Sequence, residues 1–171
     1  MNNSQPAPSG TLDFVEGVYE FNRIGQVTPP GHFNADRIGF YTGMQLEEMA
    51  EKMVSIASGI VTVNDRQAFL AFAESVDKWG KAFKEGKMHG AVLRADREKM
   101  LDADGDIAVV TLGAMMYQTP LFRHALCAIN AANLAKFPDG VAIRGPRTNK
   151  FLKPAGWKAP GVSVFVDHPV D

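Results

Sequence analysis

Apolar residues recur every three or four positions along most of this chain, which is the spacing of one face of an α-helix. The pattern starts with Leu12, Val15, Val18 and Tyr19. It predicts five helices, over about residues 12–24, 36–58, 64–85, 95–117 and 119–136. A β-branched stretch at 59–63 is too short to indicate a sheet. The pattern therefore predicts an all-α helical bundle.

Capping signals predict where the third helix begins and ends, and where the fifth begins. Asn64, with Gln67 three residues later, has the spacing of a capping box and predicts the start of the third helix. Gly86 predicts its end. Thr119 followed by Pro120 predicts the start of the fifth helix. The third helix should bury one apolar stripe, made of Phe69, Phe72, Ala73, Val76 and Phe83.

The two ends of the chain differ in composition from its middle. The first ten residues are polar and lack the basic and apolar segments of a signal peptide, so we expect a flexible tail at 1–10. The chain from Pro138 onward is rich in proline and glycine and is predicted to be non-helical. The expected organisation is this tail, a helical domain at 11–137 and an arm at 138–171.

Composition narrows the class of protein. The chain has 171 residues, of which 46% are hydrophobic and 22% charged, as in a soluble single-domain protein. A net charge of −1 argues against nucleic acid as a partner. Cys127 is the single cysteine and cannot form an internal disulfide. No apolar run is long enough for a membrane span, so we expect a cytoplasmic protein that binds no membrane.

Two carboxylate pairs have helical spacing: Glu48 with Glu51, and Asp102 with Asp106. The second pair leads into residues 107–116, which are apolar on every side and predict a buried helix. Charges beside a buried helix are costly unless neutralised. Four carboxylates suit a hard cation, and the sequence therefore predicts a Mg²⁺ site. The alternative is a solvated acidic face.

Other metal sites fit the sequence less well. The string DADGDI resembles the start of a calcium loop, but Ile107 and Gly113 stand where an EF-hand needs glycine and glutamate. A di-iron bundle needs Glu-x-x-His pairs. None of the histidines follows a glutamate at that spacing.

Basic residues gather near the C-terminus with no acid among them: Arg144, Arg147, Lys150, Lys153 and Lys158. Asn133 and Lys136 close the preceding helix. Mobile Arg and Lys side chains can bind a phosphate chain, although a solvated tail or a nucleic-acid contact would also explain them. Together with an acidic Mg²⁺ site, they indicate phosphoryl transfer or hydrolysis.

These motifs, in this order, resemble the MazG-like all-α nucleotide pyrophosphohydrolases, especially short single-domain phage versions. LEEMAE is similar to the family's Glu-Glu-x-x-Glu helix, and LDADGDIAVVTLG to its second metal helix. NLAKF and the glycine/lysine-rich segment after it resemble the family's Asn-x-x-Lys and substrate loop, and EFNRIG its Glu-Phe-His-x-x-Phe-Gly segment. Ala103 replaces an acid found in many members, and Asn22 replaces a histidine.

The resemblance implies hydrolysis of a (deoxy)nucleoside triphosphate to monophosphate and pyrophosphate by a homodimer or homotetramer. MazZ-type phage relatives act on dGTP, so we expect a purine substrate. The expected metal ligands for Mg²⁺, or Mn²⁺ in its place, are Glu48, Glu51, Asp102 and Asp106. Glu47 and Glu48 are the expected catalytic residues. The expected substrate-binding residues are Asn22, Asn133, Lys136, Arg144, Arg147, Lys150 and Lys153.

Two alternatives stay open at the level of sequence. The same fold could act on dUTP, dCTP or an alarmone. The chain could also be a non-catalytic helical adaptor whose charged patches contact other macromolecules.

Overall fold

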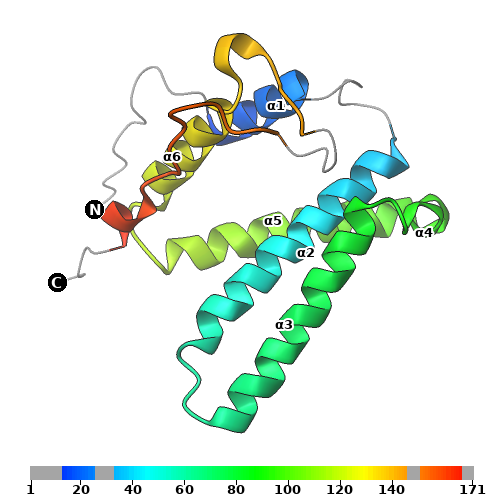
Figure 1. Ribbon diagram of the computed structural model, residues 1–171, viewed down its shortest axis with the longest axis vertical. Helices are drawn as coiled ribbons and strands as arrows, with labels where there is room; N and C mark the ends of the chain where they lie inside the picture. Colours follow the sequence, from blue (N-terminus) through cyan, green and yellow to red (C-terminus); the bar gives the residue numbers. More distant parts are fainter. Residues whose placement is uncertain (1–12, 26–32, 146–150, 167–171) are drawn as a thin grey trace. The chain divides into compact units, whose positions relative to one another are not determined.

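The computed structural model describes residues 13–25, 33–145 and 151–166, and these are mostly helical (Figure 1). Within these ranges there is no β-strand, only an isolated bridge between Arg144 and Phe151. The prediction of an all-α protein is confirmed. The helices are α1 (Phe14–Gly25), α2 (Ala35–Ala57), α3 (Val63–Lys84), α4 (His89–Arg94), α5 (Arg97–Met116) and α6 (Phe122–Leu134), with 3₁₀ turns η1 (Pro138–Gly140) and η2 (Val162–Phe165).

The chain divides into two compact units. One contains residues 33–103, and the other combines residues 1–32 with residues 104–171. The boundary falls inside α5, so this helix contributes to both units. The expected division into tail, helical domain and arm follows sequence order, whereas these units follow packing.

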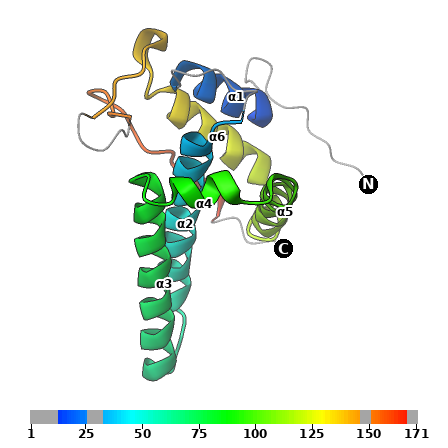
Figure 2. The same cartoon turned by 90° about the vertical axis from the view of Figure 1, so that its right-hand side faces the viewer.

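Helices α2 and α3 form an antiparallel hairpin, seen along its length in Figure 2. Asn34 caps α2, because its side-chain oxygen accepts a hydrogen bond from the amide of Arg37 at 3.1 Å. The buried residues of the two helices are mostly small. They are Ala35, Gly39, Gly43, Ala50, Met53 and Ala57 on α2, and Ala73 and Gly80 on α3.

The hairpin is closest at two glycines. A Cβ atom added to Gly80 would lie 2.9 Å from the carbonyl oxygen of Gly43 and 3.3 Å from the amide nitrogen of Glu47. Real Cβ atoms do not approach carbonyl oxygens so closely. Only residues without a side chain therefore allow α2 and α3 to pack at this distance.

The apolar stripe predicted for α3 is only partly buried. Ala73 is buried, but Phe72 is 61% exposed, so the prediction that it belongs to the core is wrong. Gly80 packs against α2 and the Phe83 ring lies near Gly39 of α2, whereas Phe72 stays in contact with water. The predicted cap is wrong as well, since α3 begins at Val63 after Thr62 and Asn64 lies inside the helix. Gly86 follows the helix with φ of 76°, as its predicted role requires.

Helices α1 and α6 pack together in the other unit. Gly17 of α1 is buried against the buried side chain of Asn130 on α6. Three rings continue this core: Phe21 lies 4.9 Å from Phe137 and 5.4 Å from Phe151, measured between ring centroids. This core therefore joins α1, the end of α6 and the C-terminal arm.

Helix α6 begins at Phe122, two residues after the predicted proline start. The Thr119 hydroxyl nevertheless accepts a hydrogen bond from the amide of Leu121 at 3.1 Å and donates one to the carbonyl of Phe165. Thr119 therefore links the turn before α6 to η2.

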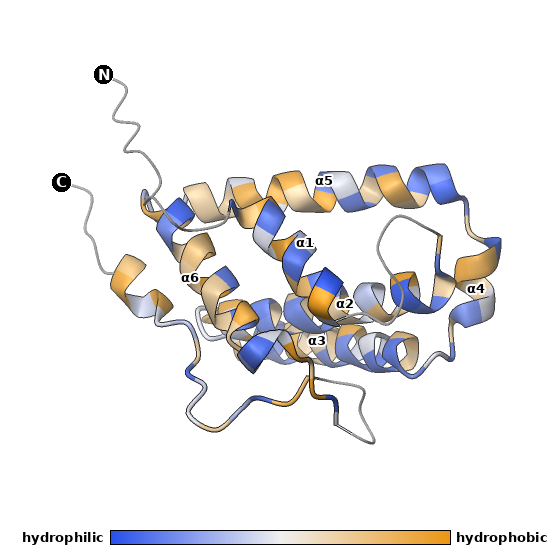
Figure 3. Cartoon of the chain, turned by 90° about the horizontal axis from the view of Figure 1, so that it is seen from above, coloured by the Kyte–Doolittle hydropathy of each residue, from blue (hydrophilic) through white to orange (hydrophobic). Residues whose placement is uncertain are grey.

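Helix α5 is not buried as predicted. None of its residues is buried, and Val109 and Val110 are 68% and 66% exposed. Figure 3 shows how α5 changes from hydrophilic residues at its start to hydrophobic ones further along. The prediction assumed that an apolar helix is buried by other segments of the same chain. No helix among the described residues is long and apolar enough to cross a membrane.

Candidate functional site

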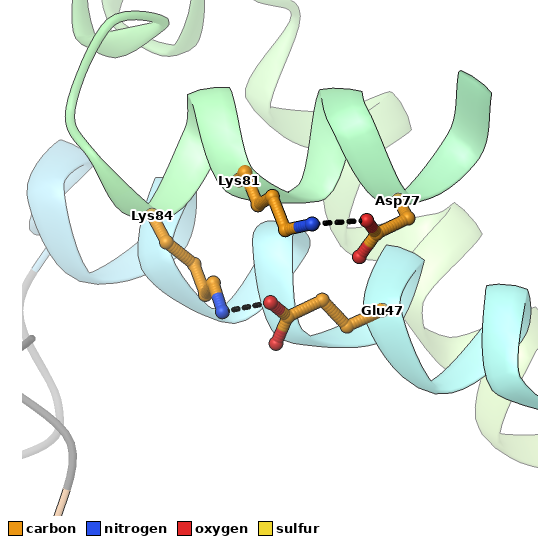
Figure 4. A network of polar contacts seen from close by, with 4 residues as sticks. All are labelled: Glu47, Asp77, Lys81 and Lys84. Carbon is orange, nitrogen blue, oxygen red and sulfur yellow. Dashed lines mark hydrogen bonds and ion pairs between the residues drawn. The ribbon is translucent and has the colours of Figure 1, made fainter. Parts of the chain in front are cut away.

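The predicted catalytic residue Glu47 lies on α2 and forms an ion pair with Lys84 of α3 (Figure 4). Both side chains are mostly covered, with 19% of Glu47 and 12% of Lys84 exposed. A second pair lies beside it, because the Lys81 ammonium donates a hydrogen bond to Asp77 at 2.5 Å. The two helices of the hairpin thus share a charged side.

Glutamate and aspartate side chains of both helices lie on this charged side. Counted from the glycine crossing towards the loop that joins α2 and α3, Glu47 lies about 6 Å along α2 and Asp77 about 4.5 Å along α3. Glu51 follows Glu47 by four residues, and Glu74 precedes Asp77 by three, so each shares its neighbour's side of the helix. We call Glu47, Glu51, Glu74 and Asp77 the acidic face.

The electrostatics of Lys81 support this arrangement. The hydrogen bond to Asp77 and the charge of Asp77 raise the pKa of Lys81, and the charges of Glu47 and Glu74 raise it further. Carboxylates from both helices therefore act on one ammonium group. Exposed Glu48 lies next to this face on α2.

Glu74 and Asp77 were not among the residues predicted from sequence. The signal was available, since the two acids have the same helical spacing that singled out Glu48 and Glu51. A five-residue connection between the second and third helices, at 58–62, also requires them to lie antiparallel. Acids on the third helix should then have been compared with those on the second.

The other predicted metal ligands, Asp102 and Asp106, lie exposed on α5. In the parts of the chain that are described, no three His, Cys, Asp or Glu side chains are grouped closely enough to hold a metal ion. The ligand set of Glu48, Glu51, Asp102 and Asp106 stays a prediction.

The predicted substrate-binding residues that are described all belong to one unit, which contains α1, α6 and the arm. They are Asn22, Asn133, Lys136, Arg144 and Lys153. The other two predicted residues, Arg147 and Lys150, lie outside the described residues. The arm therefore carries its basic residues on the unit formed by α1 and α6.

Arg144 is held at the base of the arm. Its guanidinium lies 4.4 Å from the ring centroid of Phe151 and donates a hydrogen bond to the carbonyl of Gly25, at the end of α1. The amide of Leu152 also donates to the carbonyl of Ile143 at 2.7 Å. These contacts hold residues 143–144 against residues 151–152 and the end of α1.

Two lysines lie over one indole ring. The amino nitrogen of Lys153 is 4.3 Å from the ring centroid of Trp157, and that of Lys136 is 5.7 Å from it. Lys136 also donates a hydrogen bond to the Asn133 side-chain oxygen at 2.8 Å. We call Lys136, Arg144, Lys153, Phe151 and Trp157 the basic–aromatic cluster.

The end of α6 lies within this cluster. A helix leaves its last four carbonyl groups without helical partners, and here each has one. The carbonyls of Ala131, Asn133 and Leu134 accept backbone amide hydrogens, and that of Ala132 accepts the indole N–H of Trp157 at 2.7 Å. The negative end of the helix dipole also favours the nearby cations.

The two asparagines differ in their surroundings. The Asn22 amide donates a hydrogen bond to the carbonyl of Val18, one turn earlier on α1, at 2.8 Å. Asn133 contacts Lys136 and therefore belongs beside the basic–aromatic cluster.

Trp157 was not singled out from sequence, because an aromatic residue in an irregular segment has no periodicity to indicate its partners.

The arrangement offers two kinds of chemistry. The acidic face presents oxygen donors on rigid helices, and the basic–aromatic cluster presents ammonium and guanidinium groups beside flat rings.

Comparison with known proteins finds no relative of the chain. No protein-family model, curated protein or solved structure matches it.

Proposed function

We propose that the protein is a Mg²⁺-dependent nucleotide pyrophosphohydrolase of the MazG-like type. It would hydrolyse a (deoxy)nucleoside triphosphate, with preference for a purine such as dGTP, to the monophosphate and pyrophosphate. The observation that carries the proposal is the acidic face, where α2 and α3 each contribute two carboxylates to one side of a rigid hairpin.

The chemistry of these donors fits the cation. Mg²⁺ prefers carboxylate oxygens, and Glu51, Glu74 and Asp77 are the side chains that would hold it. No three acids of the described residues are grouped closely enough as they stand, so these side chains would first have to turn towards one another. Mn²⁺ would serve in its place. When bound, such a cation neutralises negative charge on phosphate oxygens and lowers the pKa of a bound water. Lys81 and Lys84 compete for the same carboxylates, so cation binding requires them to turn away.

The chain's own residues then have separate tasks. Glu47 or Glu48 would accept a proton from the attacking water, which adds to phosphorus as the bond to the leaving phosphate oxygen breaks. Lys136, Lys150 and Lys153 would hold the phosphate chain, and Arg144 and Arg147 would support them. Asn133 and Asn22 would position the nucleoside.

The proposed assembly is a homodimer or homotetramer. Its support is the exposed apolar surface of α5, including Val109, Val110 and Met116. Isolated chains rarely leave a large apolar patch in water, and such patches mark interfaces. A second copy of the chain would cover it.

One observation favours the non-catalytic alternative. The acids Glu47 and Asp77 already have lysine partners, as in a helical adaptor whose charges serve only the fold. The same fold acting on dUTP, dCTP or an alarmone is the other alternative. A screen of all common nucleotides with Mg²⁺ or Mn²⁺, with pyrophosphate release as the readout, separates these cases. Pyrophosphate release from a purine triphosphate is expected, and no release from any nucleotide would favour the adaptor.

A further inference from the structure

The ring of Trp157 is fixed from two directions. The backbone from Pro154 to Trp157 forms a turn closed by a hydrogen bond of 3.0 Å, and Gly156 within it has φ of 81°. This conformation is typical of the third position of a type II turn and favours glycine. The indole N–H then donates to the carbonyl of Ala132 on α6. Backbone and side chain together determine where the ring lies.

This fixed ring brings together two lysines that are far apart in sequence. Lys136 follows α6 and Lys153 belongs to the arm, yet both amino nitrogens lie within 6 Å of the Trp157 ring centroid. An ammonium group is attracted to the face of an indole ring. Trp157 therefore restricts two flexible side chains that would otherwise sample many rotamers.

The charges at this position favour an anion as the ligand. Two ammonium groups over one ring concentrate positive charge at one place, and an anion is attracted to it. An anion with several charged oxygens in a row can contact both groups at once, whereas a single phosphate has fewer oxygens to share. The chemistry that matches is a linear polyphosphate.

We propose that Trp157 is a positioning residue that holds Lys136 and Lys153 as a binding site for the polyphosphate chain of the substrate. The choice of ligand rests on the proposed function, but binding at this site requires neither a divalent cation nor turnover. The site lies within the unit formed by α1, α6 and the arm.

Calorimetric titration of the full chain with inorganic tripolyphosphate, in EDTA, tests the site. Saturable binding is expected, about tenfold weaker in Lys136→Ala and in Lys153→Ala, because each loses a charge-assisted hydrogen bond. Lys158→Ala removes the same charge from an exposed position in the arm and should bind as the wild type does. Orthophosphate should bind more weakly than tripolyphosphate. No binding, or equal loss in all three variants, would overturn the site.

A pair of substitutions isolates the role of the ring. Trp157→Phe and Trp157→Leu both remove the hydrogen bond to Ala132, but only phenylalanine keeps an aromatic face for the ammonium groups. If Trp157 positions the lysines, Trp157→Phe should bind tripolyphosphate several times more tightly than Trp157→Leu. Equal affinities would mean that the side chain only fills space and would overturn the positioning role.

Fluorescence locates the response and separates this proposal from the enzymatic one. The chain has two tryptophans, so Trp79→Phe leaves Trp157 as the only one. Its emission should change with tripolyphosphate and saturate at the calorimetric affinity, and an unchanged emission would overturn the site. Tripolyphosphate binding by a protein that hydrolyses no nucleotide would support this site while overturning the proposed enzyme.

Discussion

Gly43 and Gly80 face each other reciprocally where α2 crosses α3. A Cβ on Gly43 would lie 2.6 Å from the Gly80 carbonyl oxygen, and a Cβ on Gly80 would lie 2.9 Å from that of Gly43. The acidic face begins one turn beyond this crossing, so the distance between its two helices depends on both glycines.

Gly80→Ala should therefore destabilise the protein. Alanine improves helix propensity by about 1 kcal/mol, but the new methyl group must push two backbones apart, and overpacking of this kind costs about 1–3 kcal/mol or more. We expect a net loss of about 1–2 kcal/mol in urea unfolding. Gly105→Ala is the matched control, because nothing lies within 4 Å of its Cβ, and it should stabilise α5 slightly. Equal effects at both positions would contradict the close crossing.

A second glycine prediction concerns α1 and α6. A Cβ on Gly17 would lie 1.6 Å from the amide nitrogen of Asn130, whose side chain is buried. Gly17→Ala should destabilise the native state by about 2 kcal/mol in the wild type. In an Asn130→Ala background the same substitution should be neutral or stabilising, because the obstructing side chain is gone. The same cost in both backgrounds would show that the two residues are not coupled.

The location of the metal ligands is tested by comparing two aspartates. If the acidic face holds the cation, Asp77→Asn should lower pyrophosphate release by a factor of about 10² or more. It should also remove any thermal shift caused by Mg²⁺. If the ligand set predicted from sequence is right instead, Asp106→Asn should have these effects. Wild-type-like turnover in Asp77→Asn would exclude the acidic face as the metal site.

The ion pair on α1 predicts a pH dependence of stability. Glu20 accepts two hydrogen bonds of 2.6 Å from Arg23, which lowers the pKa of Glu20 in the folded state. A carboxyl group with a lowered folded pKa stabilises the protein above its unfolded pKa, and this contribution is lost as pH falls through the folded value. Glu20→Gln should therefore be slightly less stable than the wild type near pH 7 and equally stable in acid. A difference that is constant with pH would contradict the pair.

The assembly is tested on α5. Val110 is 66% exposed, so Val110→Asp should leave the stability of an isolated chain nearly unchanged. In an oligomer that buries this helix, the same substitution places a charge in the interface and should weaken association at least tenfold. Light scattering over micromolar concentrations measures this. A wild-type protein that is strictly monomeric and fully active would rule out the proposed assembly.

The sequence predicted helices well and contacts between them less well. The bounds of α2 differ from the expected ones by a single residue at each end, because its polar cap and periodic apolar residues are local signals. Helix α4 was missed, since six residues carry no usable periodicity. The exposure of Phe72 and of α5 was also missed, because the width of a helix contact depends on its partner. Gly43 and Gly80 bring the hairpin so close that small residues form the crossing, although Phe83 of α3 also lies near Gly39 of α2.

The candidate site shows the same difference between what local sequence signals predict and what only contacts in the fold reveal. The basic residues of the arm were predicted from composition. The five described substrate-binding candidates belong to one unit, and they are Asn22, Asn133, Lys136, Arg144 and Lys153. Glu74 and Asp77 were missed because α3 was considered only for its apolar stripe. Trp157 could not be found, since its role comes from a turn and a helix end that meet only in the fold.

The pairing of α1 with α6 has a consequence for the order in which the chain can fold during synthesis. About a hundred residues separate the two helices, and the whole of residues 33–103 is made between them. The hairpin of α2 and α3 is local and can form as soon as α3 leaves the ribosome, whereas α1 must wait for α6. Of the helices in the described residues, α1 is translated first and is therefore among the last to gain its native neighbours. Until α6 has been made, the side of α1 that packs against it stays exposed to water.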